Sequence, residues 1–103
     1  MAIAVEVTTD SPLDVYFEGV KRLGASPGGP HPDAACLFHW VTELDGGGWR
    51  VTDVWETKEQ ALEFIQGRVG PIMEELGGSE PQLRFIEVAN VLTAGQRVPA
   101  HAN

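Results

Sequence analysis

Residues 49–62 read Trp-Arg-Val-Thr-Asp-Val-Trp-Glu-Thr-Lys-Glu-Gln-Ala-Leu, and this stretch decides the fold. Its first half alternates large apolar side chains with smaller or polar ones, which is typical of a strand. Its second half begins with Thr57 and Gln60, which have the spacing of a capping box at the start of a helix. The stretch therefore predicts a strand over 49–56 that leads directly into a helix.

A second strand precedes this one across a glycine-rich turn. Residues 35–44 carry apolar side chains in both alternating sets, as in a strand that is covered on both faces. Gly46, Gly47 and Gly48 tolerate the positive φ angles of a tight hairpin. We therefore expect the strands over 35–44 and 49–56 to pair as an antiparallel hairpin.

The N-terminal part of the chain predicts a strand and then a helix. Residues 2–8 alternate β-branched and other residues, as a half-buried strand does. Ser11 suits an N-cap and Pro12 suits the first helical position, so a helix is expected to begin there and to end at Gly24. The residues at helical spacing on its inward face are Leu13, Phe17, Val20 and Leu23.

The remaining segments follow from their glycine and proline residues. Residues 25–33 predict a surface loop, which is either a plain connector or a flap over a pocket. The helix after Thr57 is expected to break or kink at Gly70 and Pro71, because proline removes a backbone donor. A further strand is expected over 82–92. The tail over 95–103 has little to bury and follows a single domain over 1–94, so we expect it to be a flexible tail, either disordered or an arm onto a partner.

The order of these elements is β-α-β-β-α-β, the ferredoxin-like split βαβ arrangement of an α+β protein. Its two helices would cover one face of a four-stranded antiparallel sheet. The strands over 35–44 and 82–92 are apolar on both faces, whereas a sheet with one wet face alternates. We therefore expect a second copy of the chain to cover the other face, which predicts a homodimer closed across the sheets.

The composition excludes several classes of partner. The formal net charge of −8 comes from 15 acidic and 7 basic residues, and no basic stripe forms. Phosphate groups would be repelled, so neither nucleic acid nor an anionic membrane surface is an expected partner. One cysteine excludes an intramolecular disulfide, and no apolar run is long enough for a membrane span. Since the first residues lack a signal-peptide pattern, we expect a cytoplasmic protein.

The run Phe38-His39-Trp40-Val41, the glycine-rich turn and the run over 48–57 resemble sequences of the dimeric α/β-barrel proteins. The resemblance extends over residues 3–92 and is closer to small actinobacterial proteins grouped near the antibiotic-biosynthesis monooxygenases. It implies a dimer that closes into an α/β barrel, with a pocket between each sheet and its own helices. Known activities of that superfamily are cofactor-free oxidation of polyketide phenols, haem degradation, lactone isomerisation and cyclisation.

The haem-degrading members of this superfamily carry an Asn on the first strand, a Trp at the end of the third strand and an iron-binding His on the second helix. Trp55 matches the Trp, but Val5 and Val7 stand where the Asn would lie, and residues 58–69 include no His. The resemblance therefore implies neither a cofactor nor a haem held by that ligand. The missing Asn also departs from the Asn-Trp pair of the cofactor-free oxygenases.

Asp53 and His39 are the candidate catalytic residues. Asp53 lies in an otherwise apolar strand, where a carboxylate is costly unless it is paired. Two hairpin registers fit the sequence: pairing Leu44 with Trp49 places Trp40 opposite Asp53, whereas a slip of one residue places His39 opposite Asp53. In the second register, Asp53 would fix the tautomer of His39 for proton transfer. A salt bridge or a satisfied core histidine is the structural alternative for these two residues.

Aromatic side chains supply a candidate wall for a flat hydrophobic ligand, although an aromatic core would use the same residues. The candidate substrate-binding residues are Trp55, Trp40, Phe38, Phe64 and Tyr16, the last of which is expected to point partly away from the core. No metal site is predicted, because Cys36 and His39 are three apart on one strand and would lie on opposite faces.

The sequence supports two functional hypotheses. The first is a cofactor-independent enzyme that acts on a small hydrophobic, aromatic or polyketide-like molecule by oxygenation, isomerisation or cyclisation. The second is a non-catalytic small-ligand binder or structural dimer of the same fold. In that case Asp53 and His39 would be buried partners that hold the core together.

Overall fold

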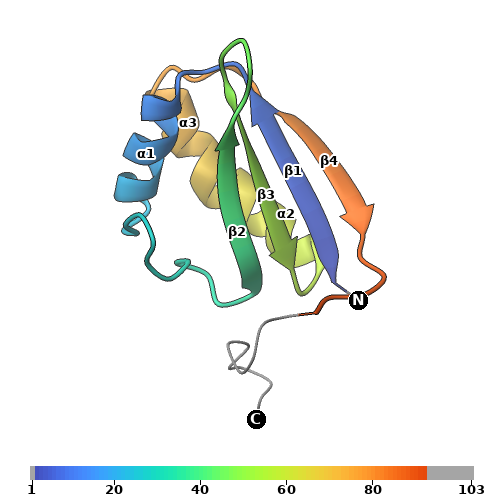
Figure 1. Ribbon diagram of the computed structural model, residues 1–103. Helices are drawn as coiled ribbons and strands as arrows, with labels where there is room; N and C mark the ends of the chain where they lie inside the picture. Colours follow the sequence, from blue (N-terminus) through green and yellow to red (C-terminus); the bar gives the residue numbers. More distant parts are fainter. Residues whose placement is uncertain (1, 93–103) are drawn as a thin grey trace.

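The computed structural model describes residues 2–92, and a four-stranded antiparallel sheet runs through them (Figure 1). The strands lie in the spatial order β2-β3-β1-β4. Their bounds are β1 (Ile3–Thr9), β2 (Cys36–Glu43), β3 (Trp49–Trp55) and β4 (Gln82–Glu87). Both β1 and β3 are central, and each neighbouring pair is antiparallel. The predicted ferredoxin-like α+β fold is therefore confirmed.

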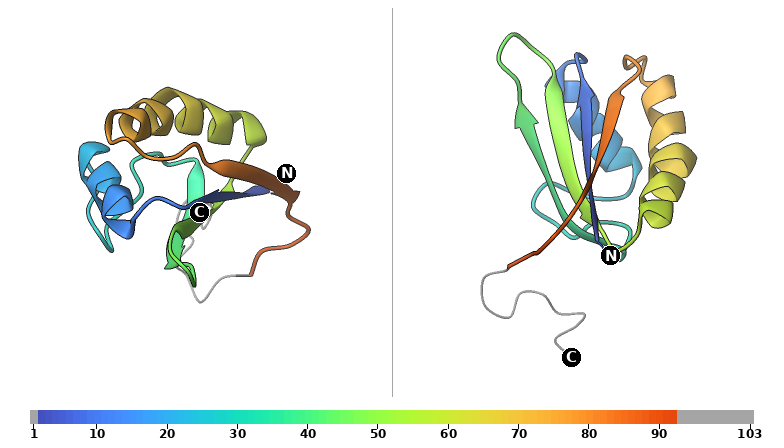
Figure 2. Two further views of the ribbon diagram at one scale, coloured as in Figure 1. Left: turned by 90° about the horizontal axis from the view of Figure 1, so that it is seen from above. Right: turned by 90° about the vertical axis from the view of Figure 1, so that its right-hand side faces the viewer.

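All helical segments cover the same face of this sheet, and the opposite face is left open (Figure 2). The helix between the first two strands is α1 (Leu13–Arg22), and the helical segment before β4 has three parts. These parts are α2 (Lys58–Phe64), the π-helix η1 (Ile65–Val69) and α3 (Gly70–Glu75). The core therefore lies in one layer, between the sheet and these helices.

Alternation along β3 builds most of this core. Its residues alternate between buried and half-buried, and the buried set is the one that faces the helices. Val5 on β1 and Trp55 on β3 are fully buried, and Ala61 and Phe64 of α2 pack into the same cluster. Burying an aromatic side chain of this size removes a large apolar area from water, so Trp55 anchors the sheet to α2.

The local signals around β3 are confirmed. Thr57 Oγ1 accepts a hydrogen bond from the backbone N–H of Gln60 at 3.2 Å, which caps α2. The hairpin glycines Gly46, Gly47 and Gly48 all have positive φ. A side chain at Gly48 would also collide with the backbone of Thr9, so the turn packs closely against the end of β1.

Of the predicted break or kink at Gly70 and Pro71, a break is wrong, because the backbone stays helical through both residues. The backbone N–H of Gly70 bonds to the carbonyl of Ile65, five residues earlier, in the wider π-type turn. This change of bonding pattern places Pro71 in the first turn of α3, where its missing N–H needs no partner.

Two expectations about α1 are also wrong. Pro12 occupies the N-cap position, and no side chain caps the helix. Ser11 is instead buried and accepts a hydrogen bond from the backbone N–H of Ser79 at 2.9 Å, which ties the entrance of α1 to the segment before β4. Phe17 is 43% exposed, whereas its neighbour Tyr16 packs against the core.

Strand β4 ends at Glu87, five residues before the predicted end at Leu92. Its partner β1 begins at Ile3, which pairs with Glu87, and one further backbone hydrogen bond joins the N–H of Val88 to the carbonyl of Ala2 at 3.2 Å. The boundary predicted at residue 94 and the tail over 95–103 lie outside the described residues. Within residues 2–92, no helix is both long and apolar enough to cross a membrane.

Candidate functional site

The pairing of β2 with β3 places His39 directly opposite Asp53. Of the two registers that fit the sequence, the structure has the one that brings these side chains together. Asp53 belongs to the buried set of β3, so both side chains leave the sheet on the side of the helices. Trp40 pairs with Thr52, and alternation therefore directs its side chain to the open face.

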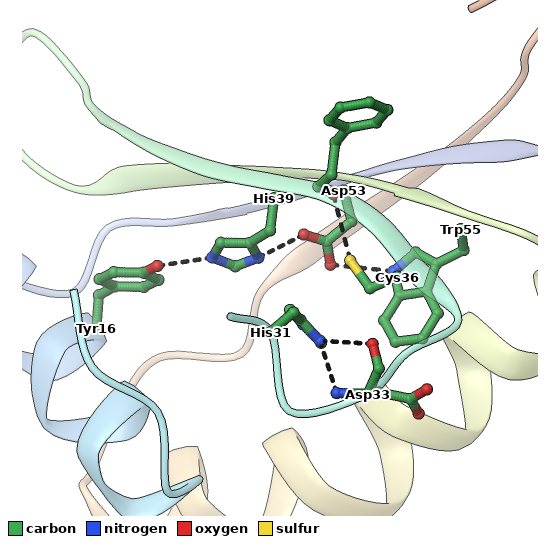
Figure 3. A network of polar contacts seen from close by, with 8 residues as sticks. Tyr16, His31, Asp33, Cys36, His39, Asp53 and Trp55 are labelled. Atoms are coloured by element: carbon green, nitrogen blue, oxygen red, sulfur yellow. Dashed lines mark hydrogen bonds and ion pairs between the residues drawn. The ribbon is translucent and has the colours of Figure 1, made fainter. Parts of the chain in front are cut away.

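Asp53 uses both of its carboxylate oxygens. Oδ1 lies 2.6 Å from Nδ1 of His39, and Oδ2 accepts a hydrogen bond from the indole N–H of Trp55 at 3.1 Å (Figure 3). Asp53 is only 4% exposed, so these two contacts replace the water that the carboxylate loses. Because a carboxylate accepts hydrogen bonds, Nδ1 of His39 carries a proton, and the lone pair of the neutral ring lies on Nε2.

Tyr16 completes the network from α1. Its hydroxyl lies 2.6 Å from Nε2 of His39, and the two rings are nearly parallel at 16°. Burial, together with the negative charge of Asp53, raises the pKa of Tyr16, so the phenol stays protonated near neutral pH and donates to the imidazole. We call Tyr16, His39 and Asp53 the triad.

The triad borders a cavity of about 630 Å³ that lies between the sheet, α1, η1 and the loop over 25–32. A volume of this size is typical of sites that hold a small organic molecule. Apart from the triad, most of its wall is apolar, with contributions from Val20, Leu23, Val51, Ile65, Val69 and Met73. The cavity thus offers one polar edge to a largely hydrophobic ligand.

The other predicted substrate-binding residues take different positions. Phe64 borders the cavity and is 5% exposed, and Phe38 and Trp40 lie at its border on β2. Alternation along β2 sends the side chains of Phe38 and Trp40 to the open face of the sheet. Trp55 is fully buried and supports the site through its bond to Asp53. Substrate binding by these residues stays a prediction.

The expectation that Cys36 and His39 lie on opposite faces is wrong, because β2 contains a bulge. Cys36 pairs with Trp55 and Phe38 with Val54, so Leu37 is the extra residue. The bulge turns Cys36 toward the cavity, where its thiol donates to the carbonyl of Phe38 at 3.2 Å. Burial raises the pKa of this thiol, which therefore stays protonated and unreactive. Within residues 2–92, no three His, Cys, Asp or Glu side chains are grouped as metal ligands.

His31 is a site residue that is not among the predicted site residues. It lies in the loop before β2, and its ring packs 4.9 Å from that of Phe64 and 5.5 Å from those of Trp55 and His39. Its Nδ1 accepts a hydrogen bond from the backbone N–H of Asp33 at 3.0 Å. Only its place in a loop rich in proline and glycine could have indicated a role, because its partners lie far away in the sequence.

Burial lowers the pKa of His31, and nearby His39 lowers it further, whereas the negative charge of Asp53 opposes this effect. The ring is therefore neutral near pH 7. Nδ1 lies 3.0 Å from the backbone N of Asp33 and 3.2 Å from its carbonyl oxygen. Because a backbone N–H can only donate, we assign Nδ1 as the acceptor, which places the proton of the neutral ring on Nε2. The loop thus presents a neutral N–H donor next to the triad.

We expect this lowered pKa to make stability depend on pH. As the pH falls below about 6.5, His31 takes up a proton in the unfolded chain before it does so in the folded protein. The free energy of unfolding therefore decreases until the pH reaches the lower pKa of the folded state, and His31 causes no further loss below that pH. Melting temperatures of the native protein and of His31→Phe between about pH 7.5 and pH 5 test this expectation. The variant, which cannot titrate at this position, should have the flatter profile. Parallel profiles would contradict it.

The helical segments that follow Thr57 bring no histidine to the cavity, since residues 58–75 include none. The histidine ligand of the haem-degrading proteins thus has no counterpart on α2, η1 or α3. The residues present do not fit a haem bound in that way.

A comparison with solved structures finds a similar chain from Deinococcus radiodurans, a "putative antibiotic biosynthesis monooxygenase". The two chains share 14% sequence identity with a TM-score of 0.57, over 91% of this chain and 98% of that one. Neither models of protein families nor curated proteins match this sequence. At this identity the likeness shows a shared fold, and it confirms the ferredoxin-like fold of the single chain that the resemblance to the antibiotic-biosynthesis monooxygenases implied.

Proposed function

We propose that this protein is a cofactor-independent enzyme that removes a proton from a small hydrophobic, aromatic or polyketide-like molecule. The observation that carries this proposal is the triad, which places a hydrogen-bonded base at the edge of a largely apolar cavity. A general base must lie within hydrogen-bond reach of its proton and be oriented by a partner. Asp53 orients His39, and the cavity has room for a substrate whose proton lies within hydrogen-bond reach of the triad.

The triad can accept a proton without any added group. In the resting state, the hydroxyl of Tyr16 donates to Nε2 of His39. When a substrate proton passes to the oxygen of Tyr16, the phenol proton moves to Nε2, so the net result is one proton on His39. The carboxylate of Asp53, 2.6 Å from Nδ1, offsets the positive charge that develops on the ring.

The electrons of the broken bond remain on the substrate. Loss of a C–H proton next to a carbonyl gives an enolate, and loss of a phenolic O–H proton gives a phenolate. Return of the proton to a different carbon is isomerisation, attack on a second carbonyl is cyclisation, and reaction with dioxygen as co-substrate is oxygenation. All three reaction types of the first hypothesis thus begin with the step that the triad supports.

The second hypothesis, a non-catalytic ligand binder, is favoured by one observation. Within the described residues, no buried side-chain nitrogen or oxygen lacks a hydrogen-bond partner. A fully satisfied polar network also suits a protein in which the triad holds the walls of a binding site. Such a protein would bind the same ligands without exchanging their protons.

Hydrogen exchange separates the two hypotheses. The probe is 2-tetralone, an aromatic ketone whose α C–H bonds exchange slowly with solvent near neutral pH. An enzyme of the proposed type should replace these hydrogens with deuterium in D₂O much faster than buffer does, as followed by proton NMR. A panel of related aromatic ketones covers differences in fit. Binding of these ketones without faster exchange would favour the binder.

We also propose that the open face of the sheet is the interface of a homodimer. Trp40 is 50% exposed on this face, which it shares with Phe38, Val54 and Ile86. A cluster of large apolar side chains at the surface is typical of an interaction site. A second copy of the same face would cover it and would leave both cavities on the outer, helix-covered sides.

Placing a charge in this face should separate the dimer. Trp40→Glu would bury an unpaired carboxylate at the interface, which is costly, so we expect a molar mass near that of one chain by light scattering. Gln66→Glu is the matched control, because it adds the same charge on exposed η1. A native protein that is already monomeric at micromolar concentration would contradict the proposed dimer.

A further inference from the structure

His31 has one ring nitrogen without an assigned role. The hydrogen bonds of its side chain use only Nδ1, which contacts the backbone of Asp33. No buried side-chain nitrogen or oxygen among residues 2–92 lacks a hydrogen-bond partner. Since Nε2 of His31 makes none, it is not fully buried, and His31 is one of the residues that line the cavity.

The position of His31 relative to the triad suits a shared ligand. The rings of His31 and His39 are 5.5 Å apart and tilted by 53°, and both border the same cavity. His31 lies on the same side of the sheet as His39 and Asp53, below them in the view of Figure 3. One small molecule can therefore contact the base of the triad and the free N–H of His31 at neighbouring atoms.

We propose that His31 is an oxyanion-stabilising residue whose Nε2–H donates a hydrogen bond to a carbonyl oxygen of the substrate. The substrate class that follows is an aromatic ketone with an acidic C–H next to its carbonyl. This inference rests on the proposed function, because removal of that proton by the triad creates the charge that His31 receives.

The charges in the step balance. The C–H proton passes through Tyr16 to His39, and the electron pair of the C–H bond forms the enolate, whose negative charge lies largely on oxygen. His31 lowers the energy of that charge by hydrogen bonding and does not transfer its own proton. A preorganised donor aimed at developing charge is commonly the largest single contribution to catalysis.

The surroundings of His31 keep it a neutral donor in a fixed position. The backbone N–H of Asp33 holds Nδ1, and Oδ1 of Asp33 accepts from the backbone N–H of Ala35 at 2.9 Å, which fixes the loop. Phe64 and Trp55 pack on the ring. The charged or titratable groups around it are Asp33 in the loop, Cys36 and His39 on β2, and Asp53 on β3. Little side-chain freedom is left to lose when a ligand binds.

A comparison of two ligands tests the hydrogen bond without relying on activity. Tetralin has the carbon skeleton of 2-tetralone but no carbonyl oxygen. The measured quantity is the ratio of the affinity for 2-tetralone to the affinity for tetralin. This ratio should be several-fold higher in the native protein than in His31→Phe, since one neutral hydrogen bond is worth roughly 0.5–1.5 kcal/mol, or about 2–10-fold in affinity. His31→Phe keeps an aromatic ring against Phe64 but has no donor. Equal losses of affinity for both ligands would overturn the proposal.

The exchange reaction gives the second readout. His31→Phe should slow deuterium exchange into 2-tetralone by roughly 10²–10³-fold, the effect of removing one oxyanion donor. His31→Gln, whose amide can place a donor near the position of Nε2, should recover part of the rate. Unchanged melting temperatures show that each variant is folded. If His31→Phe melts early, the role of His31 is tested by the ligand preference of His31→Gln instead.

The outcomes for His31 and for the triad are distinguishable. If exchange is lost in His39→Gln but is unchanged in His31→Phe, the role of His31 is overturned and the proposed function stands. If the native protein does not exchange any ketone of the panel, both proposals fail together. If His31→Phe loses exchange and the preference for the ketone, and His31→Gln regains part of each, the assignment of His31 is supported.

Discussion

Replacing His39 with glutamine is expected to slow proton removal from a bound substrate by roughly 10²–10⁴-fold, the usual contribution of a general base. The reason is structural: Nε2 is where the proton comes to rest in the triad, since Tyr16 gives up its own proton as it takes the substrate's and Asp53 is fully engaged. The measurement is the rate of deuterium exchange into 2-tetralone. Ligand affinity should change far less than this rate.

Asp53→Asn provides the matched comparison. An amide has nearly the shape of the carboxylate, but its NH₂ group can turn toward Nδ1 of His39 and favour the wrong tautomer, with the proton on Nε2. We therefore expect a loss of rate of the same order as in His39→Gln. Exchange at the native rate in both variants would show that the triad is structural. The binder hypothesis would then describe this protein.

The second large effect concerns stability. Trp55→Ala is expected to destabilise the fold by roughly 3–5 kcal/mol, as is usual when a buried Trp or Phe is truncated to alanine. Trp55 is fully buried, packs on Phe64 at 5.4 Å and donates to Asp53. For a domain of this size, each kcal/mol lowers the melting temperature by roughly 4–8 °C, so thermal unfolding should detect the loss easily.

Trp55→Phe separates packing from hydrogen bonding in this prediction. Phenylalanine keeps much of the ring contact but leaves Oδ2 of Asp53 without its donor, which costs about 1–3 kcal/mol for a buried acceptor. The variant should therefore melt between the native protein and Trp55→Ala. If Trp55→Ala melts within about 2 °C of the native protein, Trp55 is not the anchor of the core that its burial indicates.

The parts of the fold that were predicted correctly depend on short-range chemistry. Thr57 and the hairpin glycines identify a cap and a turn through bonds and dihedral angles within a few residues. The hairpin register does not follow in this way, because the glycine-rich turn accommodates either pairing of β2 with β3. The outcome depends on which β2 side chains find partners beneath the helices: His39 meets Asp53 and Tyr16 there, and Trp40 goes to the open face.

The residues that sequence reasoning misplaced depend on contacts between distant segments. The bulge at Leu37 brings Cys36 to the same face as His39. The sequence does not predict this bulge, because no glycine or proline lies at that position. The packing of His31 depends on how the loop over 25–33 returns across Phe64 and Trp55. Tyr16, which was expected to point partly away from the core, contacts His39 at the border of the cavity. The contact between His39 and Asp53 is one of the two registers that the sequence allowed, and the catalytic role of this pair stays a prediction.

The most direct test of the account is to locate the proton in a complex. The protein, labelled with ¹⁵N in its histidines, is titrated with 4-nitrophenol at a pH where the free phenol is mostly protonated. The ring nitrogens of His39 are followed by NMR, and the phenol is followed by its absorbance. We predict that the bound phenol is ionised and that both nitrogens of His39 carry protons, because the triad has taken the phenol proton. A bound phenol that stays neutral, with the lone pair of His39 still on Nε2, would contradict the account.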